Sequence, residues 1–356
     1  MRVTFSRHHI VRPTIQRMHG YVPGEQPQDK RYIKLNSNEN PYPASPRVLE
    51  ALQHAIGEDL RLYPDPVANR LRDKAAEVYG LKREQILVGN GSDDLLTMLM
   101  RTCVGPGDRV AYPVPTYSLY DDLVTMQDGE IVRVPFADDF SLPPQLANVD
   151  AKLTILCHPN APSGTLPTHA QVEDLAQRVS GILVIDEAYI DFAEETALPL
   201  VHKYPHVVIL RTFSKSFSLA GMRVGLAFGH PEFMQQLLKV KDSYNVNRLS
   251  IVAATAALED YHWMQKHVGK IRATRTRLTT ELRKLGYLVY DSHTNFILAR
   301  KKGSSQDPIY RGLKDQGILV RYFSVPELAD CLRITVGTDE EIDKLVEAME
   351  TLMQNA

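Results

Sequence analysis

Short apolar runs alternate with helix-like stretches along the first two thirds of the chain, and this alternation predicts the fold. Continuous β-branched runs such as 182–186 (ILVID) and 207–210 (VVIL) are typical of strands that are covered on both faces. Strands separated by helices of about ten residues predict βαβ units and a mostly parallel sheet. The expected strands lie within residues 85–89, 108–113, 130–136, 152–160, 181–189 and 206–212.

Beyond about residue 230 the pattern changes to longer helical stretches. These stretches cover 248–286, strand-like runs return at 287–291, 294–300 and 332–337, and a last helix is expected over 339–353. The sequence therefore predicts an α/β fold, with a large domain whose mostly parallel central sheet is flanked by helices and a smaller α/β domain. The expected division is an N-terminal arm at 1–35, the large domain at 36–245 and the small C-terminal domain at 246–356.

The composition is ordinary for a globular protein, and 356 residues are enough for two such domains. The net charge of −2 gives no overall attraction to nucleic acid or to a membrane surface, so local clusters must bind any anion. No apolar run reaches the roughly 18 residues that span a bilayer. Cys103, Cys157 and Cys331 are far apart and form no CxxC pair, which argues against a metal or dithiol site and favours a cytoplasmic compartment.

The N-terminal 24 residues contain no acidic residue and carry four regularly spaced arginines. A cleaved transit peptide can have this composition, but the segment lacks the continuous apolar core of a secretory signal. Pro13 would interrupt an amphipathic helix. A structural arm of the mature protein is therefore the favoured interpretation. The arginines are Arg2, Arg7, Arg12 and Arg17.

Polar residues follow four of the expected strands, at the edge where ligands of an open parallel sheet bind. The first strand leads into GNGSDD, in which Gly89 and Gly91 permit close approach of a ligand. Ser92 and Asp93 are residue types that begin helices, and a helix N-terminus attracts phosphate. By itself the motif is also typical of an ordinary capped turn.

The next two polar strand ends carry an amide and two carboxylates. In HPNAPSGT, two prolines and a glycine fix a loop that holds Asn160, although a rigid turn needs the same residues. Asp186 and Glu187 end a strongly apolar strand, where a carboxylate is costly unless it meets a cation. Tyr189 follows three residues after Asp186. A solvated strand end or an acidic magnesium site are alternatives, but no GxxxxGK[ST] motif supports an NTPase.

The fourth strand end is RTFSKSFSLAGMRVG, residues 211–225. Lys215 is a single amine among hydroxyls, with no acidic residue between 196 and 214. A poorly solvated lysine loses proton affinity, and from a reference pKa of about 10.4 it must fall several units to become a nucleophile. Arg223 can neutralise a phosphate through a bidentate contact. Taken alone, a surface lysine in a serine-rich loop is the alternative.

Together the four strand ends offer a phosphate cradle, an amide, a carboxylate and a lysine. This set fits pyridoxal 5′-phosphate, whose aldehyde reacts with a lysine amine. The ring nitrogen of this cofactor needs a carboxylate to stay protonated. Its phosphate, with a charge near −2, needs N–H groups, hydroxyls and an arginine.

The order Asn160, Asp186, Tyr189, Lys215, Arg223 resembles that of the fold-type I aminotransferases, which use pyridoxal phosphate. The segment TFSKSFSLAG is similar to the lysine signature of this family. More narrowly, the chain resembles the histidinol-phosphate aminotransferase branch over essentially its whole length. The stretches that carry the resemblance are KLNSNENPYP, YPD, PTYSLY, DEAYIDF, RTFSKSFSLAGMRVG, YNVN and CLRITVG.

The resemblance implies three catalytic residues, Lys215, Asp186 and Tyr189, and a set of cofactor contacts. Lys215 would bind the cofactor aldehyde and later move a proton, and Asp186 would pair with the ring nitrogen. Asn160 and Tyr189 would hydrogen-bond the ring 3-oxygen, and Tyr117 would stack on the ring. The phosphate would lie among Gly91, Ser92, Asp93, Thr212, Ser214 and Arg223, with Tyr63 coming from the partner subunit of a homodimer.

The resemblance also implies amino transfer between glutamate and a phosphorylated second substrate, histidinol phosphate, in histidine biosynthesis. Arg333 would bind the carboxylate of the amino donor. Arg321 would help to receive the phosphate. Tyr21, Asn38 and Asn160 complete the expected substrate contacts, so the N-terminal arm would belong to the mature fold. The chain departs from the usual P-N-N-P-T-G loop, because it has PNAPSG with Ala161 and Ser163.

Three alternatives stay open at this point. An aromatic amino acid aminotransferase would still need Arg333 and would depend less on Arg321. A threonine-phosphate decarboxylase would have a similar fold and a phosphate ligand. A ligand-sensing domain of a transcription regulator would carry some 70 further residues before the fold, whereas about 30 precede IKLNSNENP.

Overall fold

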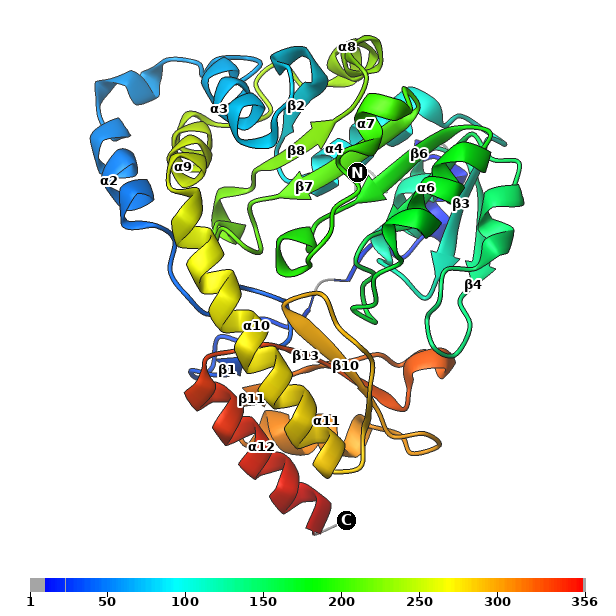
Figure 1. Cartoon of the computed structure of the whole chain (residues 1–356), viewed down its shortest axis with the longest axis vertical. Helices are drawn as coiled ribbons and strands as arrows, with labels where there is room; N and C mark the ends of the chain where they lie inside the picture. Colours follow the sequence, from blue (N-terminus) through cyan, green and yellow to red (C-terminus); the bar gives the residue numbers. More distant parts are fainter. Residues whose placement is uncertain (1–9, 23, 355–356) are drawn as a thin grey trace, which may run out of the picture.

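A seven-stranded sheet forms the centre of the upper part of the molecule in Figure 1, a computed structural model that describes residues 10–22 and 24–354. Its strand order is β2-β8-β7-β6-β5-β3-β4. Only β8 runs antiparallel to its neighbours, so the prediction of a mostly parallel sheet is confirmed. The strands are β2 (Ile86–Gly89), β3 (Arg109–Val114), β4 (Glu130–Pro135), β5 (Leu153–Cys157), β6 (Ile182–Asp186), β7 (Val207–Thr212) and β8 (Gly225–Phe228).

Helices cover both faces of this sheet, as the continuous apolar strands predict. In β6, Leu183 and Ile185 pack into one apolar cluster and Val184 into the other, because successive side chains of a strand point to opposite faces. Helices α3 (Asn69–Tyr79), α6 (His169–Arg178), α7 (Leu200–Lys203) and α9 (Arg248–Glu259) supply the first cluster. Helices α4 (Ser92–Cys103), α5 (Leu119–Met126) and α8 (Pro231–Val240) supply the second.

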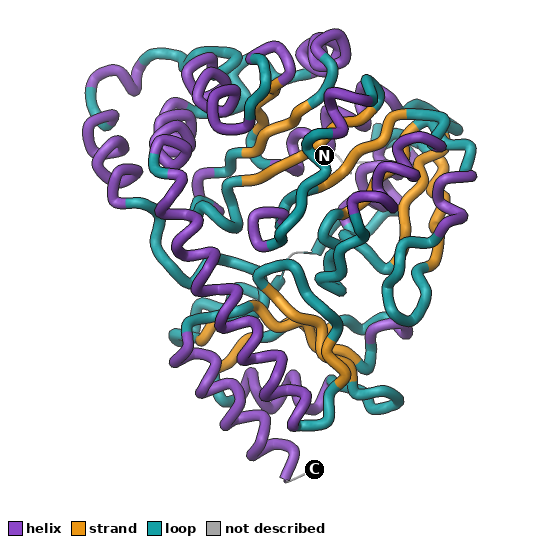
Figure 2. The backbone as a smooth tube through the Cα atoms, viewed as in Figure 1, coloured by secondary structure: helices purple, strands orange, loops and turns teal. Residues whose placement is uncertain are grey.

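A four-stranded antiparallel sheet lies below, in the order β12-β13-β10-β9. It packs with three helices around a third apolar cluster that includes Leu282, Leu313, Ile297 and Leu345. The loops between the two sheets are visible in Figure 2. The elements are β9 (Leu288–Val289), β10 (Phe296–Arg300), β12 (Arg321–Tyr322), β13 (Cys331–Thr335), α10 (Tyr261–Lys284), α11 (Asp307–Asp315) and α12 (Asp339–Gln354).

The expected helical stretches over 248–286 form two helices, α9 and α10, which meet at Asp260. Asp260 leaves the helical conformation with φ −118° and ψ 48°, and its carboxylate accepts a hydrogen bond from the Ser45 hydroxyl. Helix α9 packs on α3 and on α2 (Pro46–Ala55), whereas α10 reaches α12. The chain thus crosses from one sheet to the other within this helix pair. The predicted domain boundary at 245 and 246 stays a proposal.

The N-terminal arm connects the two parts of the molecule. A short helix, α1 (Pro13–Arg17), begins at Pro13, where the missing N–H costs nothing. Within the described residues no helix runs through Pro13, as expected. Arg12 and Thr14 contact Asp128 beside α5. Further along, β1 (Ile33–Lys34) pairs in parallel with β11 (Ile318–Leu319). Arg2 and Arg7 lie outside the described residues.

A search of residues 10–22 and 24–354 finds no helix of the length and apolar character that a membrane crossing needs.

Candidate active site

A cavity of about 1620 Å³ opens where the carboxyl ends of β5, β6 and β7 face the smaller sheet. Residues from the large sheet, the small sheet and the arm line it, as an open α/β sheet predicts for its ligand site. Thirteen of the residues expected from the sequence are among them: Tyr21, Asn38, Ser92, Asp93, Tyr117, Asp186, Tyr189, Thr212, Ser214, Lys215, Arg223, Arg321 and Arg333.

Asp186 is a buried carboxylate that meets no cation among the described residues. It ends β6 and is 3% exposed. One oxygen accepts a hydrogen bond from the Tyr120 hydroxyl at 2.7 Å, and the other accepts one from the Ala188 N–H at 3.2 Å. Burial raises the pKa of Asp186 to about 6. The strand end therefore holds a negative charge that the protein itself leaves unpaired.

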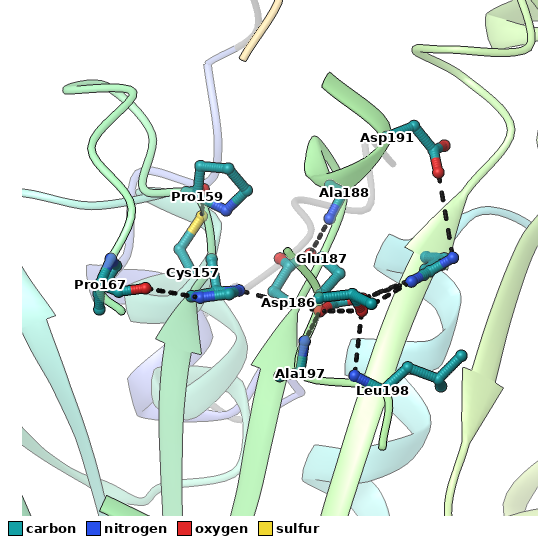
Figure 3. Close-up of polar contacts among 12 residues, drawn as sticks. Cys157, Pro159, Pro167, Asp186, Glu187, Ala188, Asp191, Ala197 and Leu198 are labelled. Atoms are coloured by element: carbon teal, nitrogen blue, oxygen red, sulfur yellow. Dashed lines mark hydrogen bonds and ion pairs between the residues drawn. The ribbon is translucent and has the colours of Figure 1, made fainter. Parts of the chain in front are cut away.

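The neighbouring Glu187 has the opposite environment, although it is equally buried (Figure 3). The Arg211 guanidinium donates to it at 2.9 and 3.0 Å. Thr196 and the Ala197 N–H donate as well. Burial opposes ionisation, but Arg211 and these donors hold the pKa of Glu187 below its usual range. The expected cation is thus present at Glu187 and missing at Asp186.

Lys215 lies in the loop that follows β7, with Nζ facing the cavity. Its nearest polar contact is the Ser37 carbonyl at 3.4 Å, and Nζ is 5.5 Å from the ring centre of Tyr189. Burial lowers the pKa of Lys215 to about 8, with a further contribution from Arg333. Asn40 donates to the Lys215 carbonyl at 3.1 Å and fixes the loop.

An anion cradle forms where α4 begins. Gly91 caps the helix with φ +88° and makes no side-chain cap, which leaves first-turn N–H groups for an anion. A Cβ at Gly91 would lie 2.5 Å from the Arg223 guanidinium, so glycine is what allows this cation to approach. Arg223 also donates to Ser214 at 3.1 Å and pairs with Asp93 at 3.3 Å.

Two tyrosines that line the cavity, Tyr189 and Tyr117, contact distant segments of the chain. The Tyr189 hydroxyl accepts a hydrogen bond from the Asn38 side-chain amide at 2.9 Å. The Tyr117 ring lies edge-on to Tyr21 of the arm, with ring centres 5.8 Å apart. Tyr117 also donates to Asp93 at 3.2 Å. Two distant segments and the arm therefore meet at one side of the cavity.

Two arginines from the small sheet reach the same cavity. The Arg333 guanidinium donates to the Asn36 carbonyl at 2.9 Å and lies 5.2 Å from the ring centre of Phe296. Its Nε is buried without a hydrogen-bond partner. Arg321 lies 5.5 Å from the ring centre of Phe323. Neither arginine has an ion pair within the described part of the chain. A ligand with anionic groups would supply the missing acceptors.

Three expected residues lie outside this cavity lining. Gly91 lies against the Arg223 guanidinium, as described above. Asn160 is buried, with its amide donating to Ser163 at 2.9 Å and accepting from Thr116 at 2.8 Å. Tyr63 is 78% exposed and stacks on Tyr244. Its expected place against a partner subunit stays a proposal.

The sequence reasoning did not identify Tyr120 or Thr335 as parts of the site. Tyr120 is fully buried and donates to Asp186, and Thr335 contacts Asn38 at 3.0 Å. Tyr120 does belong to the stretch PTYSLY, and its ring lies 5.5 Å from that of Tyr117, which precedes α5. No local signal marks Thr335, because its partner is 297 residues away.

Comparison with known proteins identifies the family of the chain. Residues 30–349 match the family model "Aminotransferase class I and II". The chain is 46% identical to histidinol-phosphate aminotransferase 1 of Trichormus variabilis, over 96% of this chain and 99% of the relative. It is 47% identical to the histidinol-phosphate aminotransferase of Citrifermentans bemidjiense, over 96% and 98%. The chain belongs to the class I and II aminotransferases.

A solved structure supports the same family. The aminotransferase superposes on histidinol-phosphate aminotransferase from Sinorhizobium meliloti, crystallised in complex with pyridoxal 5′-phosphate, with a TM-score of 0.90. The two chains are 30% identical, and 99% of each is covered. The predicted fold class is therefore confirmed in both the sheet topology and the structural match.

Asp186→Asn should stabilise the cofactor-free aminotransferase at pH 8 by about 2–3 kcal/mol and have much less effect at pH 4. The pKa of Asp186 is about 6 in the folded chain, whereas an unfolded aspartate has about 3.9. The folded state therefore carries the full penalty of a buried charge above pH 6 and none below pH 3.9. Chemical denaturation at both pH values measures the difference.

The control for this prediction is Asp315→Asn, because Asp315 is exposed at the end of α11. We expect a change below about 0.5 kcal/mol from that variant at either pH. An Asp186→Asn protein that is less stable than the unmodified protein at pH 8 would show that the buried charge is compensated.

Proposed function

We propose that this aminotransferase binds pyridoxal 5′-phosphate and transfers an amino group between glutamate and histidinol phosphate. The single observation that carries the proposal is the cavity in which an unpaired carboxylate, a lysine of lowered pKa and an anion cradle face one another. The similarity to histidinol-phosphate aminotransferases supports the choice of substrates.

The donor set of the cavity fits the cofactor group by group. The start of α4, Ser214, Thr212 and Arg223 would hold the phosphate, and the Asp93 carboxylate would give up its contact with Arg223. Asp186 would receive the protonated ring nitrogen, which provides the cation that its carboxylate lacks. When bound, the cofactor supplies an aldehyde that takes up the amino group and a ring that draws electrons from the reacting carbon.

Lys215 would act at the aldehyde end of this cavity. Its pKa of about 8 leaves part of the amine unprotonated near neutral pH, so Nζ can attack a carbonyl carbon. The same Nζ would take up the proton that leaves the α-carbon of the amino donor and return it at the end of the transfer. Tyr189 would hold the ring oxygen, and the Tyr117 ring would cover one ring face. Asn160 would join Tyr189 at this oxygen only by turning its amide away from Ser163.

The two arginines of the small sheet would each bind the anionic group of a different substrate. Glutamate and histidinol phosphate are both anionic, so one positive wall serves both in turn. Arg333 would bind the carboxylate of glutamate through the guanidinium edge that includes its unpartnered Nε. Arg321 would bind the phosphate of the second substrate, with Tyr21 and Asn38 closing the same end of the cavity.

A homodimer with shared sites is part of the proposal. Tyr63 is exposed on the surface of its own chain, and Leu60, Leu62 and Tyr244 beside it are exposed as well. Such a group of exposed apolar side chains is typical of an interface. In the dimer Tyr63 would reach the phosphate held by the partner. We also propose a cytoplasmic location, which the unpaired cysteines favour.

Arg321→Gln should lower kcat/KM for histidinol phosphate about 100-fold and leave the half-reaction with glutamate within about threefold of the unmodified protein. A charge-assisted contact to a phosphate contributes about 1.5–3 kcal/mol, and glutamate has no phosphate. Stopped-flow absorbance of each half-reaction measures the two effects separately. Arg333→Gln is the matched variant and should impair the glutamate half-reaction most. If unmodified protein prefers phenylalanine to histidinol phosphate, the substrate assignment is wrong.

Mixed dimers of Lys215→Ala and Tyr63→Ala subunits should regain about a quarter of the unmodified activity, although each variant alone is nearly inactive. Random pairing makes half of the dimers mixed, and each mixed dimer has one site with an intact lysine and an intact tyrosine. The measurement is amino transfer after the two proteins are unfolded and refolded together. No gain over the separate variants would mean that Tyr63 does not act across the interface.

A further inference from the structure

Asn38 lies at the centre of a hydrogen-bond chain that begins in β13 and ends at Tyr189. Its φ of +57° is in the left-handed region, where asparagine is tolerated better than most residues. Its carbonyl accepts a hydrogen bond from the Asn295 amide at 2.9 Å. Asn38, Asn295 and Thr335 are all at most 2% exposed. Water is therefore excluded, and the direction of each hydrogen bond matters energetically.

Thr335 contacts Asn38 twice. The Asn38 backbone N–H donates to the Thr335 hydroxyl oxygen at 3.0 Å, and a backbone N–H can only donate. The threonine oxygen lies 3.1 Å from the Asn38 side-chain oxygen. The threonine proton is free to be donated to this oxygen. The opposite amide orientation would leave that buried proton without an acceptor among the described residues, at a cost of about 1–3 kcal/mol.

The orientation of the Asn38 amide decides what Tyr189 can do. With its oxygen turned to Thr335, Asn38 presents its NH₂ group to the Tyr189 hydroxyl, 2.9 Å away. The tyrosine oxygen accepts this bond. Its single proton is therefore not used by Asn38 and can be donated into the cavity that Tyr189 lines. A reversed amide would accept that proton instead.

We propose that Thr335 is a positioning residue that sets the direction of the hydrogen bond between Asn38 and Tyr189, so that the tyrosine proton is left for a ligand oxygen. The inference rests on the proposed function, in which this ligand oxygen is the ring oxygen of pyridoxal phosphate. Arg333 lies two residues before Thr335 on β13, and its guanidinium donates to the Asn36 carbonyl. One strand thus supplies both a substrate arginine and the residue that orients the cofactor tyrosine.

Three variants separate the direction of the hydrogen bond from packing. Thr335→Val has the same shape without the hydroxyl, and Thr335→Ser restores the hydroxyl. Asn38→Asp gives Thr335 and Tyr189 an acceptor each, so the tyrosine proton turns away from the cavity even though Thr335 is intact. The control is Thr255→Val, because Thr255 is equally buried but donates only to a carbonyl of its own helix, at 2.7 Å.

The first readout is the affinity of the cofactor-free protein for pyridoxal phosphate, measured by fluorescence titration. Thr335→Val and Asn38→Asp should bind about tenfold more weakly, because a hydrogen bond to a charged oxygen is lost. Thr335→Ser and Thr255→Val should bind within about twofold of the unmodified protein. Thermal unfolding of each cofactor-free variant identifies any protein that has not folded.

The second readout is the pH midpoint of the absorbance change of the bound cofactor. A donor stabilises the anionic form of the ring oxygen, so losing it should raise the midpoint by about one pH unit in Thr335→Val and Asn38→Asp. The charged and titratable groups that face Tyr189 remain in Thr335→Val. They are Arg333 from β13, Asp186 from β6, Cys157 from β5, Tyr117 beside α5 and Lys215 from the loop after β7.

The outcomes distinguish the inference from the proposed function. If the unmodified protein binds pyridoxal phosphate but Thr335→Val matches it in affinity and pH midpoint, the inference is wrong and the function stands. Equal losses in Thr335→Val and Thr335→Ser would mean that packing, and not the hydroxyl, matters; this also overturns the inference. If the unmodified protein does not bind pyridoxal phosphate, the proposed function is wrong and the inference falls with it.

Discussion

The site depends on one buried charge, the Asp186 carboxylate, which the protein leaves without a cation. Glu187, the next residue in the chain, shows that the fold is able to pair a buried carboxylate, because Arg211 forms an ion pair with it. Asp186 instead has two neutral donors, Tyr120 and the Ala188 N–H, which orient the carboxylate without cancelling its charge. A cationic ring beside Asp186 would offset the free-energy cost of burying its charge. The stability that the cofactor-free protein lacks would then contribute to the binding free energy of the ligand.

The cavity also contains positively charged side chains, which an anionic ligand would neutralise. Arg333 and Lys215 lie near one another, and the charge of Arg333 adds to the effect of burial in lowering the pKa of Lys215. Arg321 adds a third positive charge, while Arg223 pairs with Asp93 and donates to Ser214. Anionic ligands would relieve this repulsion, while burial remains the main reason that the pKa of Lys215 is lowered. In the proposed function, substrate binding and activation of the Lys215 amine would therefore draw on the same group of positive charges.

Much of the site could be predicted because its parts follow their strands directly. Asp186, Lys215 and the GNGSDD turn each continue an apolar run, so strand recognition was enough to bring them to one sheet edge. Strand β8 was missed, because four residues that include a glycine give little periodic signal. The point at which α9 ends and α10 begins was not located either; Asp260 stands there and contacts the distant Ser45.

The supporting contacts could not be predicted for a related reason. Thr335 meets Asn38 only after the arm, the small sheet and the large sheet have assembled, and no spacing in the sequence records that meeting. For Tyr120, a buried aromatic helix position ordinarily indicates core packing, so its contact with Asp186 emerges only in three dimensions. The proposed role of Tyr63 would depend on a second chain. Local pattern thus identifies the groups that do chemistry, while tertiary contacts set their direction and charge state.

The most direct measurement is the protonation state of the ring nitrogen of bound, ¹⁵N-labelled pyridoxal phosphate, read from its NMR chemical shift at pH 8. The account predicts a protonated nitrogen in the unmodified protein, because the Asp186 carboxylate stabilises the cation, and an unprotonated nitrogen in Asp186→Asn. An unprotonated nitrogen in the unmodified protein would contradict the claim that the unpaired carboxylate exists to hold a cationic ring.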